Sequence, residues 1–207
     1  MTDRDDRENG RPASDPRWDE LRADAIGIAD RYRENGWDAL VLEPIAADPV
    51  PNAEAEPQPD VDGVEGGPDS APRGESQPGL EARVSREEYE PLEGLVDADD
   101  VTFGDAEVYY RPAESTGGDA SDETDLEDRR FAIVVERDGE SETAVCLPLA
   151  YSIGEARPVL ERALVDEELL IRVRAETDEE NRWVTFSHED PSLFLEEADV
   201  RRWRNEE

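Results

Sequence analysis

Residues 130–150 read RFAIVVERDGESETAVCLPLA, and this stretch does most to set the fold class. Two apolar runs rich in β-branched residues flank the tripeptide Arg137-Asp-Gly139. β-branched and aromatic residues favour strands, and Asp-Gly is a frequent tight-turn pair. The stretch therefore predicts a β-hairpin with strands at 130–136 and 143–150.

The sequence on the C-terminal side predicts a helix, a second strand pair and a short final helix. Ser152 and Glu155 have the spacing of a capping box, which is typical of a helix start. Asp190-Pro191 combines a good N-cap with proline at the first helical position. The predicted elements are a helix at 153–166, strands at 169–175 and 182–187, and a helix at 191–198.

On the N-terminal side the chain predicts an amphipathic helix at 16–35 and a short strand at 37–42. Asp15 and Pro16 are typical of a helix start, and Asn35-Gly36 of a left-handed end. An apolar stripe recurs at the three- and four-residue spacing of a helix. It comprises Trp18, Leu21, Ala25, Ile28 and Tyr32.

Composition divides the chain into four parts. Residues 1–14 are polar and are predicted to be a disordered tail, and 15–44 form the helix–strand piece. Residues 45–79 are rich in proline, glycine and acids and hold no aromatic residue, so we expect a linker or disordered insertion. Residues 80–207 form the main α+β body, onto which the helix–strand piece packs.

The fold class predicted from these elements is α+β. Within the main body, further strands are expected at 80–84 and 101–110, and a helix at 86–96. Runs of strands joined by short turns favour a single mixed, mainly antiparallel sheet of five to seven strands. Three main helices would cover mostly one face of it, at 16–35, 86–96 and 153–166.

The charge is extreme: 57 acidic residues face 22 basic ones, giving a formal charge of -35, and no residue is lysine. High net charge is typical of disorder, but here the acids also cover segments with well-formed apolar runs. This distribution favours a folded halophilic protein, because molar salt screens like charges. The absence of lysine fits that setting or a GC-rich codon bias. Nucleic-acid binding is disfavoured, since it requires a basic surface.

Compartment and cofactor follow from what the sequence contains. No stretch has the roughly 20 apolar residues that span a bilayer, and the first residues are polar rather than signal-like. We therefore expect a cytoplasmic protein with no membrane association. The single cysteine, Cys146, lies in an apolar strand and reads as a buried hydrophobic residue. Without a glycine-rich phosphate loop or a cysteine cluster, no cofactor or metal is predicted.

His188 is the only histidine and the one candidate for catalysis. Beside Glu189 and Asp190 it could act as a general base, because a neighbouring carboxylate fixes the imidazole tautomer. The alternative is a strand-to-helix turn in which Asp190 caps the helix and His188 is only a turn residue.

Arginines form the candidate binding surface. Strand alternation places Arg172 and Arg174 on the face opposite Leu169, Ile171 and Val173, and Arg182 follows across the turn. Such a surface could bind an unknown protein partner or a small anionic ligand. The alternative is that these arginines pair with neighbouring carboxylates.

Several segments follow one another along the chain: Trp18-Asp-Glu-Leu, Tyr32-Arg-Glu-Asn-Gly-Trp37, Phe131-Ala-Ile-Val-Val135, Leu147-Pro148 and Val184-Thr-Phe-Ser-His-Glu-Asp-Pro191. In this order they resemble a group of small uncharacterised proteins from halophilic archaea. It implies a cytoplasmic archaeal setting and carries no activity, cofactor or site. The sequence thus leaves two hypotheses: a non-catalytic binding or regulatory module, or a small hydrolase or transferase that uses His188.

Overall fold

The computed structural model describes residues 16–44, 46–50, 79–98, 101–111, 128–176 and 182–206. Its helices are α1 (Pro16–Glu34), α2 (Arg86–Val96), α4 (Ile153–Asp166), the 3₁₀ helix η1 (Pro191–Phe194) and α5 (Glu197–Glu206). Its strands are β1 (Asp38–Val41), β2 (Ala46–Val50), β3 (Gly79–Val84), β4 (Asp105–Arg111), β5 (Arg129–Asp138), β6 (Thr143–Ser152), β7 (Leu169–Ala175) and β8 (Val184–His188).

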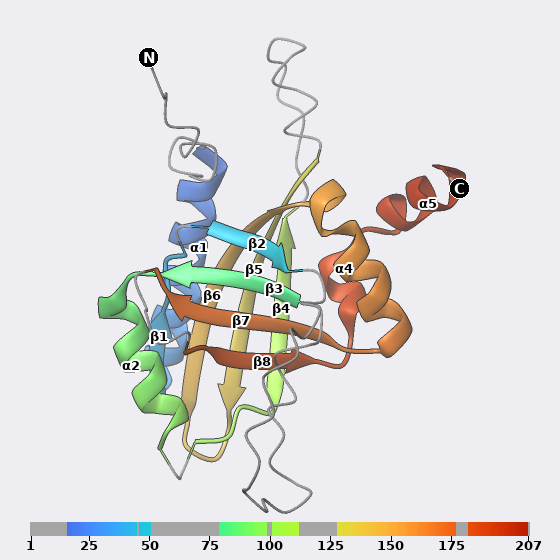
Figure 1. The fold of residues 1–207 in the computed structure, drawn as a ribbon. Coiled ribbons are helices and arrows are strands. Elements are labelled where there is room, and N and C mark those ends of the chain that lie inside the picture. Colours follow the sequence, from blue (N-terminus) through green and yellow to red (C-terminus); the bar gives the residue numbers. More distant parts are fainter. Residues whose placement is uncertain are drawn as a thin grey trace, which may run out of the picture.

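These strands form two four-stranded sheets, not the single sheet predicted. Sheet A has the order β1-β6-β5-β4, and sheet B has the order β2-β3-β7-β8. Each sheet is mixed: β1–β6 and β3–β7 are parallel pairs, and the other described pairs are antiparallel. Figure 1 shows the strands of sheet B running across those of sheet A. The α+β class is correct, and the sheet count was wrong.

Two layers of strands are needed because sheet A is apolar on both faces. On β5, Phe131 and Ile133 pack in the cluster that includes Trp18 and Leu21 of α1. The alternate residues of β5, represented by Val134, pack in the cluster shared with sheet B. A strand with two apolar faces must be covered twice. Helix α1 covers one face and sheet B the other.

Sheet B, in contrast, has one face toward this core and one polar face. Along β8 buried and exposed residues alternate, with Val184, Phe186 and His188 inside and Thr185 and Ser187 outside. Helices α2 and α4 lie at opposite ends of the strands of sheet B in Figure 1. The expectation that three helices cover mostly one face of one sheet was therefore wrong.

Most predicted elements are present, with differences at three places. The helices expected at 16–35, 86–96 and 153–166 and the hairpin at 130–150 match observed elements closely. The linker interpretation of 45–79 was wrong for Ala46–Val50, which form strand β2 despite Pro49. The strand expected at 101–110 begins only at Asp105.

The third difference is at the C-terminus, where the predicted helix at 191–198 is a 3₁₀ turn followed by α5. The tail 1–14, residues 51–78 of the expected linker and residues 112–127 lie outside the described residues. No helix in the described part of the chain is long and apolar enough to cross a membrane.

Helix α5 is held to sheet A by a buried ion pair. Asp199 of α5 accepts from Arg130 Nε at 3.1 Å and also from Arg130 Nη2. Both side chains are at most 5 % exposed. Beside them the guanidinium of Arg157 lies 5.6 Å from the ring centre of the buried Trp203. Residues 201–204, three of which are arginines, thus lie on a helix that is docked onto the core.

Candidate functional site

The candidate site lies where β5 of sheet A and β8 of sheet B bring two ionisable side chains together. Glu136 Oε1 and His188 Nε2 are 3.0 Å apart. The two side chains are only 5 % and 2 % exposed. A carboxylate and an imidazole thus meet between the sheets, in the low-dielectric interior where electrostatic interactions are strong.

Strand alternation explains how both side chains come to face the interior. Glu136 lies two residues after Val134, so it shares the face of β5 that is turned toward sheet B. His188 shares the inner face of β8 with Val184 and Phe186. Its ring packs against Phe194 in a T-shaped arrangement with centroids 5.2 Å apart.

The alternative predicted for His188 and Asp190, a strand-to-helix turn, was right for Asp190 and wrong for His188. The carboxylate of Asp190 accepts from the amide of Ser192 at 3.1 Å, and Pro191 opens η1, as the helix-start pattern predicts. His188, however, is the last residue of β8 and is buried. It therefore belongs to the core between the sheets, not to the exposed turn.

The Glu136–His188 pair is close but poorly aligned. Neither Glu136 Oε1 nor His188 Nε2 has a hydrogen-bond partner of good geometry among the described residues. A buried polar atom without an aligned partner carries a desolvation cost of about 1–3 kcal/mol. Such atoms in a folded protein call for an explanation, and a functional role or a bound water or ion is among the usual ones.

A cleft of about 320 Å³ lies beside this pair, with Glu136 in its wall. Much of its remaining wall is apolar and comes from α2, from residues 101–104 and from both sheets. The apolar residues of the wall include Val96, Val101, Phe103, Ala106 and Phe186. Phe103 and Phe186 form a T-shaped pair with centroids 5.6 Å apart.

The polar residues that border the cleft contribute mainly their backbone to it. Asp105 is opposite Arg137 in the register, so its side chain is on the face of sheet A away from Glu136. Thr185 and Ser187 are on the outer face of β8, where Ser187 Oγ donates to Glu168 at 2.6 Å. Among the described residues that line the cleft, Glu136 is therefore the one whose charged side chain faces it.

Asp138 fixes the loop that forms one wall of the cleft. Its carboxylate accepts from the Thr102 amide at 2.9 Å, the Glu140 amide at 2.9 Å and the Ser141 hydroxyl at 2.8 Å. These hydrogen bonds, the one from Thr102 first, lower the pKa of Asp138 from 3.8 to about 2. The loop and the β5–β6 turn are thus tied to one ionised side chain.

Replacing Asp138 by asparagine is expected to destabilise the protein in a pH-dependent way. Because the folded pKa is depressed, the stabilisation is complete above about pH 4 and is lost as the pH falls toward about 2. The difference between wild type and Asp138→Asn in urea unfolding should therefore be larger at pH 7 than at pH 3. An equal difference at both pH values would contradict this role for the carboxylate.

The candidate arginines lie at a different place, on the outer side of sheet B. Arg174 Nη2 is 2.7 Å from Glu81 Oε1, and Arg182 Nη1 is 2.9 Å from Glu93 Oε1 of α2. Arg172 projects from the same face of β7 as Arg174, yet its side chain is buried, and burial lowers its pKa. The structure places Arg174 and Arg182 against different carboxylates, those of Glu81 and Glu93.

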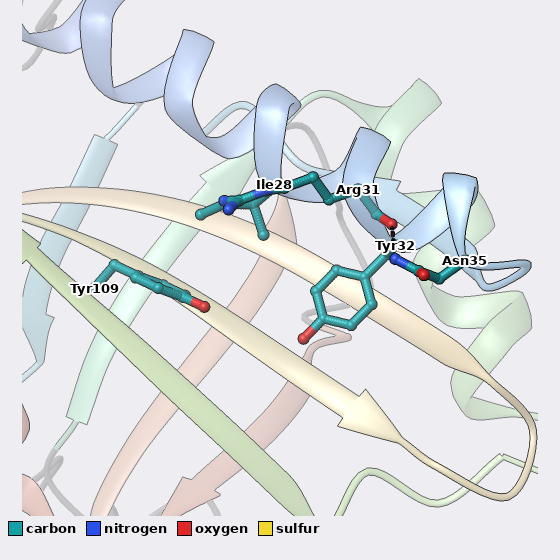
Figure 2. A pocket seen from close by; sticks show the side chains of 5 residues that line it. All are labelled: Ile28, Arg31, Tyr32, Asn35 and Tyr109. Carbon is teal, nitrogen blue, oxygen red and sulfur yellow. Dashed lines mark hydrogen bonds between the residues drawn. The ribbon is translucent and has the colours of Figure 1, made fainter.

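A second, smaller hollow of about 190 Å³ lies between α1 and β4 (Figure 2). It is lined by Ile28, Arg31, Tyr32, Asn35 and Tyr109. The hydroxyl of Tyr109 donates to Glu107 at 2.8 Å, which raises the Tyr109 pKa. The side-chain amide of Asn35 donates to the Arg31 carbonyl at 2.6 Å, so part of the polar edge is already paired. This shallow groove holds no buried charged side chain comparable to Glu136.

Cys146 lies in β6 on the α1 side of sheet A and is fully buried. Burial raises the pKa of its thiol to about 11, which leaves almost no thiolate at neutral pH. No cluster of three His, Cys, Asp or Glu side chains in the described ranges is placed to hold a metal ion.

Glu136 is the residue that sequence reasoning missed. It enters the sequence analysis only as the last residue of the strand predicted at 130–136, although the period of two puts it on the same face as Ala132 and Val134. A charged residue at a position where strand alternation predicts a buried apolar side chain indicates a candidate site. Burying a charge costs free energy unless the charge is paired or binds a ligand. The same alternation places His188 on the buried face of β8 that Phe186 also occupies.

The chain was compared with curated proteins and with solved structures, and neither comparison gives a match. A family model does match, over residues 4–196, which include both Glu136 and His188 and most of the described elements. That range ends just before α5. On this match the chain belongs to a family of unknown function, DUF7529.

Proposed function

We propose that this protein is a non-catalytic binding module and that its ligand occupies the cleft beside Glu136. One observation carries the proposal: a carboxylate that is about nineteen-twentieths buried lies in the wall of a partly apolar cleft, and its Oε1 has no well-aligned partner among the described residues. Ligand sites are commonly apolar hollows with a few placed polar groups, and the volume of about 320 Å³ is within their range.

The geometry gives less support to a hydrolase or transferase that uses His188 as general base. The Nε2 atom of His188 faces Glu136. The imidazole ring lies on the inner face of β8 and packs against Phe194. The neighbouring hydroxyl, Ser187 Oγ, is on the opposite face of the strand and donates to Glu168. An imidazole that takes a proton from a substrate needs to reach it, which this burial opposes.

The arginine surface of sheet B is also a weaker candidate for ligand binding than the cleft beside Glu136. Arg174 and Arg182 already have carboxylate partners, so a protein or a small anion would have to displace them. We infer the setting from charge: a formal charge of -35 suits a salt-rich cytoplasm, where like charges are screened. A halophilic archaeal source fits the same composition.

The test of the proposed function is a binding screen with a blocked-cleft variant. Ala106 is paired with Glu136 in the register and lines the cleft, so Ala106→Phe should fill it. A panel of one-ring fragments, with cationic, neutral and anionic members in equal number, is screened by saturation-transfer NMR. We expect saturable binding to wild type that falls at least tenfold in Ala106→Phe.

The matched control is Ala23→Phe, which adds the same ring at an exposed position of α1. It should leave binding unchanged. If no fragment binds wild type, or if binding survives in Ala106→Phe, the cleft is not the ligand site.

A further inference from the structure

We infer that the ligand of the cleft is a small organic cation, an ammonium group joined to a one-ring apolar body. This inference rests on the proposed function, since it names the class of ligand for the same site. It starts from Glu136, whose ionised carboxylate can only accept hydrogen bonds. A cation adds an attractive charge interaction with this carboxylate that a neutral ligand lacks, and an anion is repelled by it.

The surroundings of Glu136 make the carboxylate selective for a cation. Phe103, Ala106 and Phe186 line the cleft beside it, so its environment is partly apolar and a charge-assisted hydrogen bond there is stronger than in water. Asp105 is next to the cleft, but its side chain is on the face of β4 that looks toward Arg137. Arg137 in turn is 3.0 Å from Glu107, on the same outer side.

Two aromatic rings in the cleft also favour a cationic ligand. Phe103 and Phe186 line the cleft and meet edge to face at an interplanar angle of 81°. The face of an aromatic ring carries negative electrostatic potential and attracts ammonium groups. Val96 and Val101 complete a wall that suits the apolar body of the ligand. A volume of about 320 Å³ is at the lower end of ligand pockets, which favours a single ring.

His188 acts as a positioning residue behind the carboxylate. It lies on the inner face of β8, does not line the cleft, and contacts Glu136 Oε1 at 3.0 Å. The imidazole lies against the carboxylate at this distance and restricts the positions that the carboxylate can adopt. Phe194 fixes the imidazole ring from the other side.

The experiment compares three probes of the same shape by NMR titration: benzylammonium, benzyl alcohol and benzoate. With wild type we expect saturable binding of benzylammonium, at least tenfold weaker binding of benzyl alcohol, and no binding of benzoate. Glu136→Gln removes the charge and keeps the shape, so benzylammonium affinity should fall about ten- to a hundredfold. Asp105→Asn removes one charge beside the cleft and should change affinity less than twofold.

The outcomes separate the ligand class from the proposed function. Binding of benzyl alcohol or benzoate as tight as that of benzylammonium, and sensitive to Ala106→Phe, would keep the cleft as the site and overturn the cation. Equal losses in Glu136→Gln and Asp105→Asn would also overturn it, because a general charge effect would then suffice. If none of the three probes binds while other fragments fill the cleft, the cation class fails alone. The probe series on wild type does not depend on whether Glu136→Gln folds, which near-ultraviolet circular dichroism checks.

Discussion

Replacing Asp199 by alanine is expected to lower the free energy of unfolding by about 3–5 kcal/mol. Asp199 is 1 % exposed and pairs with Arg130, which is 4 % exposed. The pair is bidentate, with Nε–Oδ2 at 3.1 Å and a second bond from Nη2 to Oδ1. Removing the carboxylate leaves a guanidinium inside the protein without this counter-charge, which is the costly case. Urea unfolding followed by tryptophan fluorescence measures the change.

A matched control is available on the same helix. Arg201 pairs with Glu197 at the surface, where the two side chains are 66 % and 81 % exposed. Arg201→Ala removes an ion pair of the same kind and should cost less than about 1 kcal/mol. If Asp199→Ala were as mild as Arg201→Ala, the buried pair would not be what fixes α5 to sheet A.

Replacing Phe131 by alanine is expected to cost about 3–5 kcal/mol. Phe131 is 1 % exposed and lies on the face of β5 that packs against α1. Its removal leaves a cavity under the helix that the rigid strands on either side cannot fill. Leu147 lies on the opposite face of sheet A, and Leu147→Ala should cost about 2–5 kcal/mol.

The pair of variants tests the layered architecture. If sheet A were covered on one face only, one of the two positions would tolerate alanine. In the structure both faces are covered, so both substitutions should be costly. Val165→Ala is the control, because Val165 is 74 % exposed on α4 and its change should stay within about 0.5 kcal/mol. A mild Phe131→Ala combined with a severe Leu147→Ala would contradict the packing of α1 on sheet A.

The sequence predicts most elements of this fold because their local patterns are strong. The apolar stripe of α1 and the Ser152 cap of α4 each match the structure. Strand pairing is not a local property, so the division into two sheets could not be derived in the same way. One signal was nevertheless present: the continuous apolar runs of β5 and β6 are those of strands buried on both faces. Such strands must be covered on both faces of their sheet. A single sheet with its helices mostly on one face does not provide this.

The candidate site was predicted only in part. His188 was recognised as unusual, but its burial follows from its phase with Val184 and Phe186 rather than from the neighbouring acids. Glu136 is far from it in sequence, and their contact exists only because sheet A packs face to face on sheet B. The partners of Arg174 and Arg182, which are Glu81 and Glu93, depend equally on tertiary contacts.

The central claim is that the cleft beside Glu136 is where this protein binds a ligand. The most direct measurement is a map of backbone amide shifts during titration with benzylammonium. We predict that the largest shifts occur in residues 103–106 and 184–187, which border the cleft. Shifts concentrated around Tyr32 and Tyr109, in the groove of Figure 2, would contradict the claim, as would shifts confined to the arginines of β7 or none at all.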